Sequence, residues 1–438
     1  MRIKNNIKCL VVSLMISSGV VNAQDFSLKQ AQDYAVEHYY ESVNASLDVQ
    51  KSKAKIWELT ALGLPQVNAL GGYRFAKDLE FNVLLPPGDP GFLAAFAADN
   101  ITQGKIEATQ LIFDGSYIVG LQASKKYLEF SQVGKEKTDN DVRANVASSY
   151  YLVLISDENI SVLDGSFENL EVSIKETKAL VDQGFLDATE LDQLELMKSD
   201  LESSLQSAKF TKEVAIKMLK LNMGIDFSSS VNLSDSLSGI TEQIDLDVLL
   251  SKQFDQESNP DLKVLEIQRD LKKLDLKRYK AQRLPIIAGY YQAQTTAYQF
   301  DWDWLNNASW YDAQNIGLSI SVPLVSSGKQ GSIIKQARLE LTKMENSLSY
   351  AQNAISIQFK NAQNNLNIKN GNLQNTKRSL ALAQKIYDRT ALKQKEGLAS
   401  SFELSQMKNQ VLQSQGKYIQ ALFDLLNAKA DLDKLQKQ

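Results

Sequence analysis

Few side chains in this sequence could do chemistry. The 438 residues include one histidine, His38, and one cysteine, Cys9, so a histidine-based catalytic triad and a histidine-containing zinc site are both excluded. Carboxylates are abundant, but none sits in a recognisable catalytic pattern, and the sequence has neither a glycine-rich phosphate loop nor a metal-binding cluster. We therefore expect a protein that is not an enzyme and that holds no metal or cofactor.

Residues 1–23 are typical of a secretory signal peptide. Basic Arg2, Lys4 and Lys8 precede an apolar run that begins at Cys9, and Val21-Asn22-Ala23 is a suitable cleavage site. The run is shorter than the ~20 residues of a membrane-spanning helix, which makes a membrane anchor the weaker interpretation. The mature chain would then contain no cysteine and no disulfide.

The charge balance is acidic. The sequence has 48 basic and 52 acidic side chains, and loss of the signal peptide would lower the net charge from −4 to −7. This balance argues against nucleic acid as a partner. No apolar run of 18 or more residues follows the signal peptide, so the mature chain could enter a membrane only as strands.

Two long stretches carry the 3.5-residue apolar repeat of a coiled coil. The first extends from Val142 to Val181 without one charged residue on the seam, and the second extends from Ala337 to Tyr387 with a polar interruption at Gln358. The first predicts a helix of roughly 65 residues, on the order of 100 Å at 1.5 Å per residue. Most of the chain should therefore lie in long helices.

Residues 24–222 form a first structural repeat. Ser27 begins a capping box that predicts a helix to about Leu62, and Leu64-Pro65 ends it. Period-2 alternation predicts the strands, and a short turn containing Gly184 separates the long helix from its return helix. The remaining predicted elements are strands at about 66–82 and 101–113, a long helix at about 116–182, a tip at 183–187 and a return helix at 188–222.

A second repeat, residues 260–438, follows an irregular connector at 223–259, which we interpret as an equatorial region. Gly115 and Gly328 are 213 residues apart, as are Gly184 and Gly397, and this equal spacing indicates an internal duplication. The predicted elements are strands at about 286–300 and 314–324, a long helix at about 329–395, a tip at 396–400 and a return helix at 401–436.

Each protomer would carry four strands at one end of a long helical body. Four strands cannot close a barrel, and an open edge inside a bilayer leaves backbone groups unbonded, so the chain should oligomerise. Three copies would supply twelve strands around a lumen. Aromatic residues near the strand ends are typical of a membrane-interface girdle, although the core of a small soluble β domain would also contain them: Phe81, Tyr298, Phe300, Trp302, Trp304, Trp310 and Tyr311.

This duplicated order resembles the outer membrane efflux protein family of TolC-like channels. The resemblance covers essentially all of the mature chain and rests on Asn259-Pro260, Leu284-Pro285 and the two turns, Gln183-Gly184-Phe185-Leu186 and Glu396-Gly397-Leu398-Ala399-Ser400. It implies a mainly α fold with membrane β structure, in which a homotrimer forms a 12-stranded outer membrane β-barrel and a long periplasmic α-helical coiled-coil tunnel.

The resemblance also implies a function and partners. The chain would be the outer membrane exit duct of a tripartite efflux or type I secretion system, passively conducting small molecules or polypeptide from an inner-membrane transporter with the help of a periplasmic adaptor (membrane fusion) protein. It would lie in the outer membrane, in contact with lipid, and extend into the periplasm. The alternative is a structural or adhesive periplasmic coiled-coil protein without a pore.

The resemblance further implies roles for residues at the helix-turn-helix tips. The adaptor-contacting positions would be Gly184, Phe185, Leu186, Gly397, Leu398, Ala399 and Ser400. The gate or constriction positions would be Thr189, Glu190, Glu403 and Gln406. Ala399 departs from the family, where an arginine can latch the tips, so a salt bridge from this position is not expected. Three copies of Glu403 around an axis would repel one another and attract cations, whereas the other interpretation of Glu403 is a solvated helix face.

Overall fold

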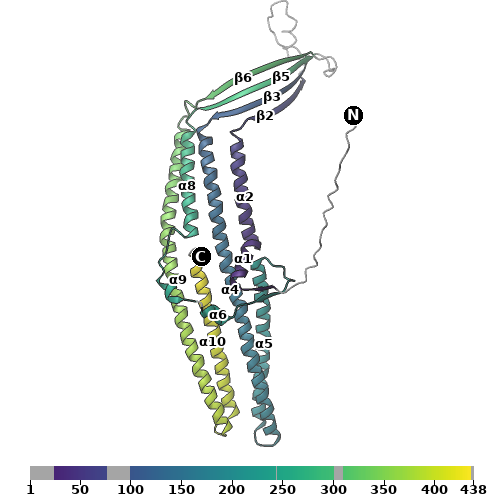
Figure 1. Ribbon diagram of the computed structural model, residues 1–438, viewed down its shortest axis with the longest axis vertical. Helices are drawn as coiled ribbons and strands as arrows, with labels where there is room; N and C mark the ends of the chain where they lie inside the picture. Colours follow the sequence, from purple (N-terminus) through teal and green to yellow (C-terminus); the bar gives the residue numbers. More distant parts are fainter. Residues whose placement is uncertain (1–23, 76–98, 243, 300–308, 436–438) are drawn as a thin grey trace, which may run out of the picture.

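A computed structural model describes residues 24–75, 99–242, 244–299 and 309–435. Several predicted features lie outside these ranges: the signal peptide, residues 76–82 of the first predicted strand, and the aromatic residues Phe81, Phe300, Trp302 and Trp304. The molecule is elongated, with a sheet at one end and two helical hairpins at the other (Figure 1). None of the described helices is both long and apolar enough to cross a membrane.

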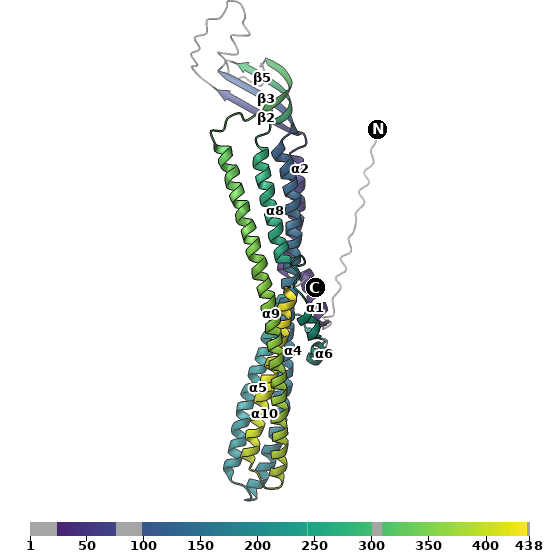
Figure 2. The same cartoon turned by 90° about the vertical axis from the view of Figure 1, so that its left-hand side faces the viewer.

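Two antiparallel hairpins form the lower shaft. The first joins α4 (Gly115–Asp182) to α5 (Ala188–Met223), and the second joins α9 (Lys329–Lys395) to α10 (Ser401–Lys434). The upper part of α4 packs against α2 (Tyr40–Ala61) and α8 (Pro260–Ala281). Figure 2 shows the four hairpin helices running side by side toward the tips.

The coiled-coil seams are buried as their periodicity predicts. Val142, Val146 and Leu170 of α4 and Leu194 of α5 are at most 9% exposed. The second seam differs at its polar interruption, because Phe359 and not Gln358 enters the core. Its ring lies 5.1 Å from the ring of Phe254, centroid to centroid. The connector therefore supplies the apolar partner that shifts the seam by one residue.

The sequence predicts one continuous helix from Ser27 to about Leu62, but the structure divides this segment into two helices. Ser27 and Gln30 do form the predicted capping box, but α1 (Leu28–His38) ends before α2 begins, and Tyr39 between them has an extended backbone (φ −71°, ψ 137°). Gly224, which ends α5, approaches this junction so closely that a Cβ atom on it would lie 2.6 Å from the His38 carbonyl oxygen. The break is thus shaped by a distant helix end, since neither proline nor glycine occurs at residues 38–40.

The connector joins the N-terminal strand to the shaft. Strand β4 (Val231–Leu233) pairs in parallel with β1 (Gln24–Phe26), and two short helices follow, α6 (Leu237–Glu242) and α7 (Leu246–Ser251). The buried Tyr150 hydroxyl on α4 donates to the Phe26 carbonyl oxygen at 2.8 Å and lies 3.1 Å from an Asp235 carboxylate oxygen. Burial raises the pKa of the Tyr150 hydroxyl, which keeps it neutral and able to donate. These contacts hold the N-terminal strand against α4.

One antiparallel sheet contains all four long strands, in the order β2-β3-β5-β6. Their bounds are Gln66–Phe75 for β2, Asn100–Phe113 for β3, Ile286–Gln299 for β5 and Trp310–Ser321 for β6. The predicted start of the last strand at residue 314 is wrong, because Trp310 already pairs with Ala297 of β5. The long β5 requires a partner for its backbone groups along this length. The strand also ends at Ser321, short of the predicted residue 324, just before Pro323, which cannot donate a ladder hydrogen bond.

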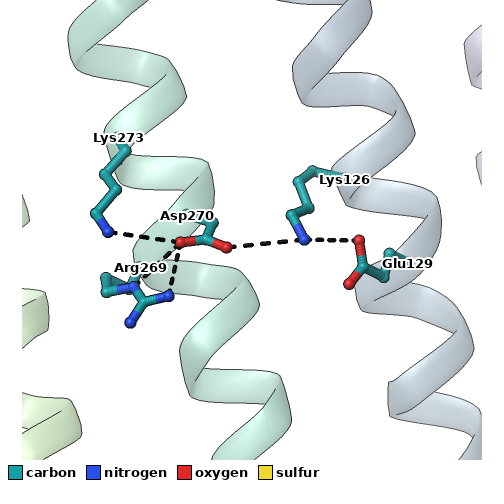
Figure 3. A network of polar contacts seen from close by, with 5 residues as sticks. All are labelled: Lys126, Glu129, Arg269, Asp270 and Lys273. Atoms are coloured by element: carbon teal, nitrogen blue, oxygen red, sulfur yellow. Dashed lines mark hydrogen bonds and ion pairs between the residues drawn. The ribbon is translucent and has the colours of Figure 1, made fainter.

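Ion pairs link α4 to α8 above the hairpins (Figure 3). The Asp270 carboxylate on α8 lies 2.8 Å from the Arg269 guanidinium and 3.8 Å from the Lys273 ammonium on its own helix. It also lies 3.7 Å from the ammonium of Lys126 on α4, which in turn pairs with Glu129 at 2.7 Å. The two halves of the chain are therefore joined there by charge as well as by packing.

Candidate functional site

The sheet has one apolar face. The strand register aligns Val67, Ala108, Tyr291 and Ile316 in one row across all four strands. In this chain Val67 is 67% exposed and Ile316 is 85% exposed. Ile316, Leu318 and Ile320 of β6 extend the face along the strand, because every second side chain points the same way. Gln314 and Asp312 interrupt this face toward the start of β6, but its exposed aliphatic side chains still require a partner other than water.

The opposite face is polar. The next row, one residue along each strand, consists of Asn68, Glu107, Gln292 and Asn315. The Glu107 carboxylate pairs with the Lys105 ammonium on the same face at 2.6 Å. A sheet with exposed apolar side chains on one side and polar side chains on the other is suited to separate a membrane from an aqueous lumen.

Three of the predicted interface aromatics are described. Trp310 and Tyr311 begin β6 and are about half exposed, and the Tyr298 ring near the end of β5 lies 6.0 Å from the Tyr311 ring, centroid to centroid. They gather at the strand ends farthest from the helices, but side-chain alternation places only Trp310 on the apolar face with Ile316, whereas Tyr298 and Tyr311 lie on the polar face. The membrane-interface girdle therefore stays a prediction.

Both hairpin tips turn through a glycine with positive φ. Gly184 has φ +75° and Gly397 has φ +74°, a conformation in which a side chain would be strained. The following amides close the turns, since Phe185 N donates to Leu180 O at 2.9 Å and Leu398 N donates to Lys393 O at 2.8 Å. Phe185 and Leu398 are each 73% exposed, so each tip presents one large apolar side chain at its end.

The predicted gate residues do not converge within one protomer. Thr189 donates to Asp187, the N-cap of α5, and these hydrogen bonds lower the pKa of the Asp187 carboxyl. Glu403 lies in the first turn of α10, where its amide donates to the Ser400 side chain at 3.1 Å. The Glu403 and Gln406 side chains are exposed.

Glu190 is separate from Glu403 and Gln406. It lines a cleft of about 770 Å³ between the two hairpins near their tips. We call this the interhairpin cleft. Leu186, Gly397, Ala399 and Ser400 of the predicted tips also line it. Its apolar walls come from both hairpins and include Leu163, Leu170, Leu194, Leu201, Leu404 and Leu412.

Sequence reasoning missed Lys408, which lines the same cleft from α10. Its ammonium lies 5.2 Å from the centroid of the Tyr387 ring, and burial lowers its pKa. No described side chain forms an ion pair with it. The signal that could have found it is its place in the chain, one residue after Met407, which with Leu404 and Val411 continues the apolar repeat in the predicted return helix. A lysine there is brought toward the partner hairpin instead of toward solvent.

Comparison with known proteins supports the architecture. Residues 255–436 match a family model described as outer membrane efflux protein. No curated protein sequence matches the chain.

Solved structures share the fold over almost the whole chain. CusC, whose structures concern folding and transmembrane channel formation, is 16% identical, with 97% of this chain and 96% of that chain covered and a TM-score of 0.73. The outer membrane protein VceC of Vibrio cholerae is 12% identical, with 92% and 94% covered and a TM-score of 0.71. The CmeC outer membrane channel of Campylobacter jejuni is 16% identical, with 93% and 85% covered and a TM-score of 0.70.

Proposed function

We propose that this chain is the exit duct of a tripartite efflux or type I secretion system. Two findings support the proposal: residues 255–436 match the outer membrane efflux protein family model, and the fold resembles that of the CusC channel. The observation that carries the proposal is the sheet with one apolar and one polar face at the end of a long helical shaft. The duct conducts its cargo passively, because the energy is supplied by an inner-membrane transporter.

The duct is a homotrimer. Strands β2 and β6 are the two outer strands of the sheet, and each leaves one row of backbone groups to be paired. Pairing β6 of one copy with β2 of the next closes a twelve-stranded barrel in the outer membrane, with the apolar rows against lipid. The helices also require neighbours, because α9 exposes a lengthwise series of large apolar residues: Leu339, Tyr350, Ile357, Ile368, Leu382 and Leu392.

The hairpin tips are the docking surface for a periplasmic adaptor. Their exposed Phe185 and Leu398 side chains stand at the same place in the two repeats, 24–222 and 260–438, so a trimer presents six similar tips in a ring. An adaptor with helical ends of its own would cover these apolar residues and connect the duct to the transporter.

The gate lies just above the tips. Around a threefold axis, Glu403 and Gln406 at the start of α10 would meet their counterparts, while Thr189 and Glu190 line the first hairpin. Three carboxylates converging in a narrow passage would hold cations. Movement of the second hairpin away from the axis would then widen the passage.

The proposal is tested by the location and assembly of the mature protein. We expect a heat-modifiable trimer band in the detergent-extracted outer membrane fraction, and stepwise conductance when that trimer is placed in a planar bilayer. A monomer released into the soluble periplasm would support a structural coiled-coil protein and refute the duct.

A further inference from the structure

The interhairpin cleft is lined by Glu190, a carboxylate that includes a hydrogen-bond acceptor without a donor in the described part of the chain. The Glu190 Oε2 atom is buried and has no hydrogen-bond partner among the described residues. A buried acceptor left unpaired is costly. The Glu190 side chain lines the cleft, so a rotation about its side-chain torsions would bring this oxygen to the N–H group of a bound molecule.

The charge on this side of the cleft is strongly negative. Glu176 and Asp200 line it together with Glu190, and none of the three has an ion-pair partner in the described parts of the chain. Residues 182–202, which include Glu190 and Asp200, contain seven acidic side chains and one basic side chain, Lys198, which pairs with Glu171. The α4–α5 wall would therefore attract a cation.

The opposite wall is different in character. It carries the Tyr387 ring, Leu404 and Leu412, together with the one lysine of the lining, Lys408. A molecule with its positive charge toward α5 and its apolar body toward α10 would match both walls. A volume of about 770 Å³ is within the range of small-molecule sites, roughly 300–1,000 Å³.

We propose that the interhairpin cleft binds amphipathic organic cations, with the ligand's cationic N–H group donating to Glu190 and its apolar body between the leucines of the two hairpins. The cleft lies inside one protomer, so the site goes beyond the exit-duct function and does not depend on it. A bound cation would hold the two hairpins together close to the tips.

Fluorescence anisotropy of ethidium with the full-length, detergent-solubilised protein tests this site. We expect saturable binding at near-physiological salt, where exposed charges are screened beyond about 8 Å. The Glu190→Gln variant should bind about tenfold more weakly, equivalent to about 1.4 kcal/mol. Lys408→Met should bind ethidium about threefold more tightly, because the substitution removes a positive charge that repels the cationic ligand in a poorly solvated cleft.

Glu195→Gln is the matched control. It removes the same charge from the same helix, but Glu195 is exposed and lies outside the cleft lining, so its affinity should stay within about twofold of the unchanged protein. The anionic dye fluorescein should not bind saturably. Equal affinities for Glu190→Gln and Glu195→Gln, equal binding of fluorescein, or no saturable ethidium binding to a conducting trimer would each overturn the site and leave the duct in place.

Discussion

Arginine substitutions at two adjacent residues of β6 would test which face of the sheet meets lipid. Ile316 is the seventh of the twelve residues of β6 and is 85% exposed on the apolar face, whereas Asn315 beside it lies on the polar face, opposite Gln292. Because side chains alternate along a strand, Ile316→Arg would place a charge in the hydrocarbon region and Asn315→Arg would place the same charge in the lumen.

The expected magnitude follows from the depth of this residue. An arginine on the lipid face near the bilayer midplane costs about 2–4 kcal/mol. A trimer contains three copies, so Ile316→Arg would destabilise the assembled barrel by about 6–12 kcal/mol, which is comparable to the whole stability of an ordinary domain. Asn315→Arg should cost less than about 1 kcal/mol per copy, because its charge stays hydrated.

The assay is the heat-modifiable trimer band in outer membrane fractions, followed by conductance of the surviving trimers. We expect Ile316→Arg to abolish or strongly reduce the band. Asn315→Arg should keep it and move the channel's preference toward anions, since three positive charges would line the lumen. Equal loss of trimer in both variants, or loss only in Asn315→Arg, would refute the assignment of the two faces.

Three further perturbations test the helical body. Gly224→Ala should lower the thermal midpoint much more than Gly184→Ala. Both residues have positive φ, which strains alanine by about 1–2 kcal/mol, but of the two only Gly224 would bring its new Cβ atom against backbone. Equal shifts of the midpoint would contradict this close approach. Burial raises the pKa of the Tyr151 hydroxyl, so the contribution of this residue to folding stability is complete below its unfolded-state pKa near 10 and is lost as the pH rises above that value. Tyr151→Phe should therefore reduce the loss of stability at alkaline pH, measured by circular dichroism. Tyr350→Phe, at an exposed site, should leave that loss unchanged. Glu403→Gln should weaken block of the channel's conductance by divalent cations, and an unchanged block would remove Glu403 from the gate.

Much of the fold follows from local patterns. The 3.5-residue repeat predicts both long helices because it requires one uninterrupted apolar seam, and the period-2 alternation predicts strands because it requires two different faces. Glycine at the tips and the Ser27 capping box are equally local, since each acts within one turn of chain. These features need no knowledge of the rest of the molecule, and the structure confirms them.

Apart from the end of β6, where Pro323 acts locally, the differences come from contacts between segments far apart in the chain. The break at Tyr39 depends on Gly224, the core position of Phe359 depends on Phe254, and the start of β6 at Trp310 depends on the length of β5. A repeat of side-chain type along one helix or strand does not indicate which distant residue will pack against it. The seam interruption was visible in the sequence, but the residue that fills it could be named only once its neighbour was known.

The sequence by itself determined the repeated order of the elements, the apolar seams, the turns and the two kinds of sheet face, because each depends on residues a few positions apart. Only the tertiary structure decided that Glu190 and Lys408, 218 residues apart, line one cleft, while Glu403 and Gln406 stay outside it. The physical reason is that the approach of two hairpins is decided by packing along their whole length, whereas spacing along the chain describes only one helix at a time.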